Sequence, residues 1–344
     1  GPVTFTDTPG LDDVGDLGAL RVQRTREVLA KTDIALLVTT PDIGVGDLER
    51  GLIAEAAARH IRLVLVINKI DTSATGHQPP ATSHEPPAIL ATFRVSALTG
   101  AGVDTLRVAL AKIVPEEETA PLVADLVSPG DLVVCVCPID SAAPKGRLIL
   151  PQQQVVREVL DSGAIAVVCR ETELAKTLAS LARKPRFVIT DSQAFKRVNA
   201  DTPKDIPLTS FSIVFARAKG DLPAYIEGVK ALKTLKDGDR VLISEGCTHH
   251  RQCTDIGTVK LPHWIKEFTG KVPAFEWTSG AAFPTDLTPY KLVIHCGACM
   301  LTRREVQNRI ARARAQHVPI TNYGVLIAAV HGIAAHPATC MVER

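Results

Sequence analysis

The sequence predicts an α/β protein of three domains, each built on parallel strands that alternate with helices. Short, continuous apolar runs recur along the chain, which is typical of strands buried on both faces of a parallel sheet. Longer segments with helical spacing of apolar residues separate these runs. At 344 residues the chain is also longer than one ordinary core accommodates, so we expect more than one domain.

Composition and charge give no support for a nucleic-acid-binding or a membrane protein. Lys plus Arg number 39 against 37 Asp plus Glu, so the net charge of +2 gives no reason to expect a nucleic-acid partner. No apolar run approaches the roughly 20 residues that a membrane span needs, and the first residues do not form a signal peptide. We therefore expect a cytoplasmic protein without a membrane partner.

The first domain is expected over residues 1–117, where the acidic run Pro115–Glu118 closes it as a linker. Its predicted elements are strands at Ile34–Val38 and Leu63–Ile67 and helices near Gly18–Lys31 and Leu48–Arg59. The proline-rich stretch Thr72–Pro87 is predicted to be a polar loop.

Two further α/β domains are expected at 118–203 and 204–344. In the second domain we expect strands Asp131–Pro138, Ala164–Cys169 and Arg186–Thr190, with helices Gln152–Asp161 and Glu171–Ala182. In the third we expect strands Arg240–Glu245 and Lys291–His295, with helices near Leu222–Leu235, Trp264–Phe268, Thr302–Gln316 and Tyr323–His336. The second domain contains no cluster of catalytic residue types.

The segment Asp7-Thr8-Pro9-Gly10 follows the short strand-like stretch Val3–Thr6 and matches the Asp-x-x-Gly switch motif of GTPases. In that motif the carboxylate reaches Mg²⁺ through water, and the glycine N–H faces the γ-phosphate. Asp7 and Gly10 are therefore predicted to contact GTP and its Mg²⁺. Alone, so short a motif is a weak signal.

Two more motifs strengthen the nucleotide site. Asn68-Lys69-Ile70-Asp71 directly follows the strand ending at Ile67 and matches Asn-Lys-x-Asp, whose carboxylate accepts both N–H groups of the guanine edge. Ser96-Ala97-Leu98 follows a short strand at Phe93–Val95, where GTPases place a loop whose backbone contacts the base. Three motifs in the right order at strand ends favour a GTPase over a chance set of turn residues.

One part of a GTPase site is missing from the sequence. No Gly-x-x-x-x-Gly-Lys-Ser/Thr segment occurs, so we expect the natural protein to be longer and this chain alone to bind and hydrolyse GTP poorly. Leu11 stands where Ras-like enzymes carry the water-positioning glutamine. Hydrolysis is therefore expected to be slow, or to depend on another group or on a monovalent cation, and no catalytic residue is assigned.

Cysteines near the C-terminus form a metal-binding pattern rather than a disulfide scaffold. Cys247-Thr248-His249 and His295-Cys296-Gly297-Ala298-Cys299 each follow a predicted strand, and open α/β sheets build ligand sites at the carboxyl ends of strands. Three thiols suit zinc with a histidine, or an iron–sulfur cluster with one iron left for an oxygen or nitrogen ligand. The fourth ligand stays open among a histidine, a carboxylate and solvent.

The remaining histidines and cysteines are assigned less specific roles. His249, His250 and His295 suit metal ligation and a supporting structural role equally well. Cys253 lies outside the pattern and is taken as an accessory thiol. The cysteines predicted to be small buried apolar side chains are Cys135, Cys137, Cys169 and Cys340.

A GTPase domain followed by Cys-x-His and then His-Cys-x-x-Cys resembles the HydF family of GTPases, which mature FeFe hydrogenases. The resemblance covers the whole chain, and its most specific part is the pairing of the motif at 68–71 with the groups at 247–249 and 295–299. It implies a GTPase domain, a dimerisation domain and a domain that binds a 4Fe-4S cluster through Cys247, Cys296 and Cys299. His249 and His295 are candidate additional ligands.

The same resemblance implies partners. It indicates a homodimeric scaffold that carries a di-iron precursor to apo FeFe hydrogenase, after two radical-SAM maturases have contributed to the precursor. Two other classes remain open. One is an Era- or TrmE-like GTPase in RNA modification or ribosome assembly, against which stand the missing basic surface and the metal site. The other is a GTPase with a purely structural zinc site.

Overall fold

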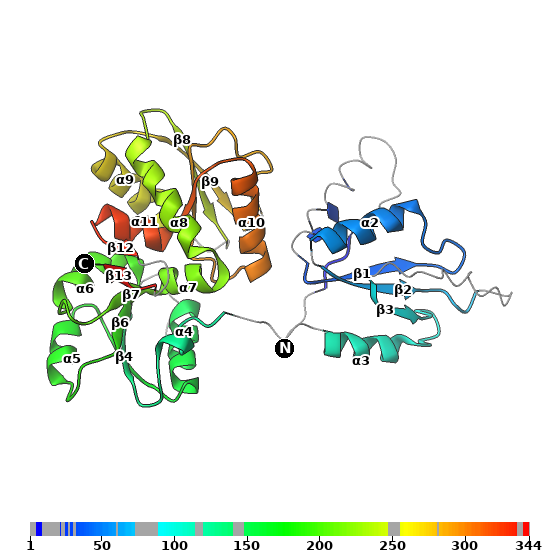
Figure 1. The fold of residues 1–344 in the computed structure, drawn as a ribbon, viewed down its shortest axis with the longest axis horizontal. Helices are drawn as coiled ribbons and strands as arrows, with labels where there is room; N and C mark the ends of the chain where they lie inside the picture. The colour runs from blue at the N-terminus through cyan, green and yellow to red at the C-terminus, as the bar shows by residue number, and fades with distance from the viewer. Residues whose placement is uncertain are drawn as a thin grey trace. The chain divides into compact units, whose positions relative to one another are not determined.

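The computed structural model describes residues 5–8, 21, 25–26, 28–29, 32–59, 61–72, 89–113, 120–139, 148–246, 255–280, 282–335 and 340–343. The chain divides into two compact units, Gly1–Glu118 and Thr119–Arg344, and each is built on parallel sheets with helices (Figure 1). The predicted α/β class is confirmed. Most of the helix expected near Gly18–Lys31 and of the loop at Thr72–Pro87 lies outside the described residues.

The first unit contains a three-stranded parallel sheet in the order β1-β2-β3. Its elements are β1 (Ile34–Thr39), α2 (Asp47–Ala58), β2 (Arg62–Ile67), β3 (Ile89–Arg94) and α3 (Val103–Ile113). Apolar side chains of β2 alternate between two clusters, since Leu63 packs with Ile53 of α2, and Val64 lies in the cluster that Leu110 of α3 covers. Among the described residues, α2 and α3 therefore cover opposite faces, and β2 ends directly before Asn68.

The second unit begins with a four-stranded parallel sheet in the order β5-β4-β6-β7. Its elements are β4 (Leu132–Val136), α4 (Leu150–Asp161), β5 (Ile165–Cys169), α5 (Leu174–Ser180), β6 (Phe187–Thr190), α6 (Phe195–Asp201), β7 (Leu208–Ser210) and α7 (Phe211–Lys219). The central strand β4 is buried along its whole length, as expected for an apolar run. Because β7 pairs with β6, this sheet extends past residue 203.

A second four-stranded parallel sheet follows, in the order β11-β10-β8-β9. Its elements are α8 (Leu222–Val229), β8 (Arg240–Glu245), α9 (Leu261–Thr269), β9 (Ala274–Ser279), β10 (Leu292–His295), α10 (Arg303–Ala315), β11 (Ile320–Asn322) and α11 (Tyr323–Val330). A short antiparallel pair, β12 (Ala334–Ala335) and β13 (Val342–Glu343), ends the described chain. Both four-stranded sheets place their first and third strands at the centre, so the connections change direction there.

Helix α11 is shorter than predicted. The sequence pattern indicated a helix from Tyr323 to His336, whereas the helix ends at Val330. Gly332 adopts a left-handed backbone conformation with φ of 71°, which ends a helix readily because glycine has no Cβ. The apolar residues after Gly332 continue as β12 instead.

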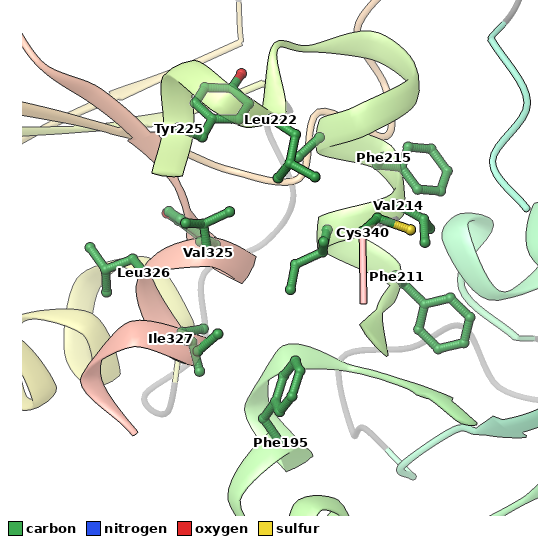
Figure 2. Packing of buried hydrophobic residues seen from close by; sticks show 14 of the residues in the cluster. Phe195, Phe211, Val214, Phe215, Leu222, Tyr225, Val325, Leu326, Ile327 and Cys340 are labelled. Carbon is green, nitrogen blue, oxygen red and sulfur yellow. The ribbon is translucent and has the colours of Figure 1, made fainter. Parts of the chain in front are cut away.

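One apolar core joins the two sheets of the second unit. Helices α7 and α11 lie at its centre, each starting directly after the last strand of a sheet and capped by that strand's final side chain, Ser210 or Asn322. Figure 2 shows this packing, in which the labelled residues are Phe195, Phe211, Val214, Phe215, Leu222, Tyr225, Val325, Leu326, Ile327 and Cys340.

Among the described residues, no helix is both long and apolar enough to cross a membrane.

Close backbone packing of α8 on β11 predicts a stability effect. A Cβ at Gly228 would lie 1.9 Å from the carbonyl oxygen of Ile320, so Gly228→Ala forces the helix off the strand. We expect a loss of about 2–3 kcal/mol in the free energy of unfolding. Urea titration followed by tryptophan fluorescence measures this, because both tryptophans, Trp264 and Trp277, lie in the second unit.

The matched control is Glu227→Ala, on the exposed side of the same helix, where the described contact that is lost is an ion pair to Lys230. That change should cost no more than about 0.5 kcal/mol. Equal urea midpoints for Gly228→Ala and the unchanged protein would contradict the assigned packing.

Candidate nucleotide-binding and metal-binding sites

The loops that follow β2 and β3 are joined by hydrogen bonds. The Oδ1 atom of Asn68 accepts a hydrogen bond from the backbone N–H of Ala97 at 3.0 Å. The backbone N–H of Asn68 donates to Thr39 at the end of β1, and that of Ile70 donates to Val95. Asn68 of the Asn-Lys-x-Asp motif therefore fixes the backbone of the Ser96-Ala97-Leu98 loop, at the shared carboxyl edge of three parallel strands.

The residues of these two loops differ in backbone conformation and exposure. Lys69 adopts a left-handed backbone conformation with φ of 62°, and Asp71 is exposed at the surface. Ser96 is buried and its Oγ accepts from the N–H of Thr99, while Leu98 is 86% exposed. An exposed carboxylate beside an exposed backbone loop offers the acceptor that the N–H groups of a guanine edge require.

The predicted switch residues are only partly described. Asp7 is exposed and its Oδ1 accepts a hydrogen bond from the N–H of Thr8 at 3.0 Å. No strand forms within residues 5–8. Gly10 and Leu11 lie outside the described residues, so the contacts of Asp7 and Gly10 with Mg²⁺ and phosphate stay predictions.

In the second unit, Cys296 stands at the carboxyl end of β10, beside the end of β8. Its backbone N–H donates to the carbonyl of Ser244 at 3.0 Å, which continues the pairing of these two strands. Its Sγ accepts a hydrogen bond from the N–H of Gly246 at 3.0 Å and a weaker one from Ala298 at 3.4 Å. Backbone N–H donors aimed at sulfur stabilise a thiolate, which is the form that binds metals.

The third predicted thiol is adjacent in the chain to one of these donors. Gly246 immediately precedes Cys247, and a Cβ at Gly246 would lie 2.7 Å from the side chain of Leu301. Glycine therefore lets the chain pass close to the loop that carries Cys299. The segment with Cys247, His249, His250 and Cys253 lies outside the described residues.

The described donors fit part of a metal site. Cys296 and Cys299 are both reduced and half-buried, three residues apart in one loop. Burial raises the pKa of the Cys299 thiol, and the nearby ammonium of Lys219 opposes that rise. Within the described ranges, no three metal-ligating side chains converge. The donor set thus fits a soft metal or cluster once a third thiolate is supplied.

His295 is buried and both of its ring nitrogens are engaged. Nδ1 lies 2.9 Å from the carbonyl oxygen of Cys296, and Nε2 lies 3.2 Å from Nη1 of Arg309. A guanidinium can only donate and a carbonyl can only accept, so the ring is neutral with its proton on Nδ1. Burial and the charge of Arg309 lower the pKa of His295 to about 4. This geometry favours the supporting role over metal ligation for His295.

Arg309 of α10 holds this arrangement and was missed by sequence reasoning. Its guanidinium is almost fully buried, donates to Glu305 at 2.7 Å and to the carbonyl of Gly280 at 2.8 Å, and reaches the hydroxyl of Ser244. Its spacing from Val306 and Ala313 places it on the apolar face of the helix, which is the signal that could have singled it out among the arginines. Its contacts tie β8, β10 and α10 together beneath the thiol loop.

A buried carboxylate at the end of β8 was also missed. Glu245 is two residues before Cys247 and accepts a hydrogen bond from the hydroxyl of Tyr323 at 3.2 Å. Burial and the charge of Glu245 raise the pKa of Tyr323 well above its usual value. Gly257 is required beside this pair, because a Cβ there would lie 2.4 Å from the tyrosine oxygen.

Comparison with protein families matches most of the second unit. The model described as the hydrogen maturase F dimerization domain matches residues 122–220, and the one described as the hydrogen maturase F tetramerization domain matches residues 223–339. The first range contains the sheet of β4 to β7 with α7. The second contains α8 except its first residue, and the sheet that precedes the loop with Cys296 and Cys299.

A curated relative links the chain to GTPases. The tRNA modification GTPase MnmE of Roseiflexus sp. (strain RS-1) is 33% identical over 131 residues, which is 36% of this chain. The match spans 27% of that relative, so the likeness concerns about a quarter of its length. The chain therefore contains a segment similar to a GTPase and two domains of the hydrogen maturase F family.

The burial of some cysteines predicts that an alkylating reagent will modify the thiols of the loop after β10 faster than the buried ones. Cys135, Cys137 and Cys340 are buried as predicted, whereas Cys169 is half-exposed. Burial raises the pKa of Cys135 to about 12 and that of Cys340 to about 11. At pH 8 in the folded, metal-free protein we expect iodoacetamide to modify Cys296 and Cys299 at least about tenfold faster than Cys135 and Cys340, because only a thiolate reacts.

Mass spectrometry of tryptic peptides measures these rates. In urea all cysteines should react at similar rates, which provides the control. Rapid labelling of Cys135 in the folded protein would show that β4 is not buried as described.

Proposed function

Because the chain belongs to the hydrogen maturase F (HydF) family, we propose that it is a GTP-binding scaffold that carries a 4Fe-4S cluster and delivers a di-iron precursor to apo FeFe hydrogenase. The family domains assign the chain to hydrogenase maturation. The single observation that supports the carrier role is the thiol loop after β10, whose Cys296 sulfur accepts a hydrogen bond from the residue beside Cys247. Cytoplasmic location and exchange with two radical-SAM maturases belong to the same proposal.

Cys247, Cys296 and Cys299 would hold the cluster. Three thiolates leave one iron for a weaker ligand, and that exchangeable position is the chemistry a carrier needs. The chain's own contribution is to hold the thiolates ready. Gly246 and Ala298 donate N–H groups to the Cys296 sulfur, and Cys299 stands just before Thr302, the N-cap of α10. A helix N-terminus favours negative charge nearby.

The first unit would bind GTP with Mg²⁺, Asp71 accepting from the guanine edge and Asn68 fixing the loop at Ala97. The GTPase relative supports this kind of activity. Asp7 and Gly10 would contact Mg²⁺ and the γ-phosphate, with a monovalent cation as a candidate helper in hydrolysis. In this proposal the domain at 1–117 is the part of the protein that binds GTP.

The proposed dimerisation domain begins at residue 118. The sequence placed its end at 203, but β7 continues its sheet and the matched family models change over between residues 220 and 223. The edge strand β5 exposes Ile165 and Val168, each 46% exposed. A second copy of this edge would continue the sheet across a two-fold axis and cover those side chains, which supports a homodimer. The residues after that changeover, from 223 to 344, would form the cluster domain, which the sequence pattern had placed at 204–344.

The cluster assignment predicts the effect of serine substitutions. Replacing Cys247, Cys296 or Cys299 with serine should remove most of the iron bound after anaerobic reconstitution and abolish hydrogenase activation, because a thiolate ligand is lost. Iron analysis and the visible absorption spectrum measure cluster binding, and a hydrogenase assay measures delivery.

Cys253→Ser is the matched control, since it removes a thiol close in sequence but outside the pattern. Four irons per chain in all three variants would rule out the assigned ligands. Tightly bound zinc without visible absorption in the unchanged protein would support the structural-zinc alternative instead.

The assignment of Asp71 to the guanine edge predicts that its substitution shifts the base preference from guanine to xanthine. In a version of the protein that also carries a phosphate-binding loop, Asp71→Asn should weaken GTP by about tenfold or more and admit xanthosine triphosphate. The reason is that an amide presents a donor where the guanine edge needs an acceptor. Competition binding with both nucleotides measures the preference, and Asp47→Asn, at an exposed position in the first turn of α2, is the control. Unchanged preference would remove Asp71 from base reading.

A further inference from the structure

A single lysine holds the backbone of the thiol loop. Lys219 is the last residue of α7, and its ammonium lies 3.3 Å from the carbonyl oxygen of Ala298, 3.1 Å from that of Cys299 and 2.9 Å from that of Leu301. An ammonium has three N–H donors, and three carbonyls of one short loop converge on it. The loop is therefore folded around this cation.

The loop conformation needs such support. Ala298 adopts a left-handed backbone conformation with φ of 58°, which is costly for a residue that has a Cβ. This conformation lets the carbonyls of Ala298 and Cys299 reach one cation, while the N–H of Ala298 points to the Cys296 sulfur. Without the cation, three partly buried carbonyls would lose a charged hydrogen-bond partner.

The lysine itself is fixed in place. Its stem packs beside the ring of Phe215, with the ammonium 5.3 Å from the ring centroid. The side chain of Gln307 on α10 donates to the carbonyls of Lys219 and Gly220, which holds the end of α7. Two residues earlier, Arg217 binds Asp125 and the carbonyls of Pro121 and Leu122, which anchors the same helix to the start of the second unit.

The charge of Lys219 also lies close to one of the thiol-bearing residues, 3.1 Å from the carbonyl oxygen of Cys299. The lysine is half-buried, so its field is screened less than that of a surface charge. A cluster on three thiolates is anionic, and a fixed positive charge stabilises its reduced form more than its oxidised form. The lysine is therefore suited both to shape the loop and to favour the reduced state.

We propose that Lys219 is a positioning residue for the cluster, which holds the Cys296–Cys299 loop in its binding conformation and raises the cluster's reduction potential. The shaping role concerns the loop alone, and the effect on potential rests on the proposed function. Neither role follows from the cysteine pattern, because Lys219 is 77 residues before Cys296 in the chain (296 − 219).

The first test uses the protein without metal. Lys219→Met keeps the apolar stem and removes the donors, and Lys230→Met is the matched control at an exposed lysine paired only with Glu227 in the described contacts. Hydrogen exchange at the amides of residues 297–301 should become about tenfold faster or more in Lys219→Met and stay unchanged in the control. Unchanged exchange in Lys219→Met would overturn the shaping role, whether or not the chain binds a cluster.

The second test uses the reconstituted protein. Lys219→Met should shift the reduction potential of the cluster to more negative values and speed iron loss to a chelator, and Lys219→Arg should restore the potential in part because it keeps the charge. Equal potentials in all three proteins would overturn the electrostatic role. If Lys219→Met fails to fold, as tryptophan fluorescence would reveal, Lys219→Gln replaces it in both measurements. Failure of the unchanged protein to bind iron would count against the proposed function and leave the exchange result standing.

Discussion

The parallel pairing of β8 with β10 is the constraint on which the second unit depends. It sets Ser244 beside His295, so the chain leaves both strands at the same edge and at the same level. Residues about fifty positions apart in sequence then meet there, as the hydrogen bond from Gly246 to the Cys296 sulfur illustrates. Arg309 lies beneath this edge and contacts both strands, which keeps the pairing rigid where the thiol loop begins.

Buried parallel strands were the most predictable part of the fold. The run that became β4 is apolar throughout, and those that became β2 and β8 have apolar centres, because both faces of these strands are covered. The bounds predicted for β8 match the structure. The strands β7, β9 and β11 were missed. β7 and β11 have three residues each and are too short for a pattern, while β9 is an edge strand with polar residues among its aromatic ones.

The residues of the candidate sites also differ in how far the sequence could predict them. Motif residues at strand ends, such as Asn68 and Cys296, could be found because the chemistry and the local context occur together in the sequence. The roles of Lys219 and Arg309 could not be found, because they arise from contacts that the tertiary fold creates, although helical spacing places Arg309 on a buried face. For His295, the sequence identified the residue but left metal ligation and a supporting role open. Its burial against Arg309 favours the supporting role.

The single apolar core of the second unit has a consequence for how the protein is maintained in a cell. The changeover between the two matched family models, at residues 220 to 223, falls within that core, with Phe215 before it and Tyr225 after it. The two regions therefore cannot unfold independently at low cost, and each alone would expose apolar surface to chaperones and proteases. A substitution far from the thiols, in β6 for instance, would then lower the abundance of the folded protein without changing the thiol loop itself. Conversely, any ligand that binds only the folded thiol loop protects the whole unit from degradation.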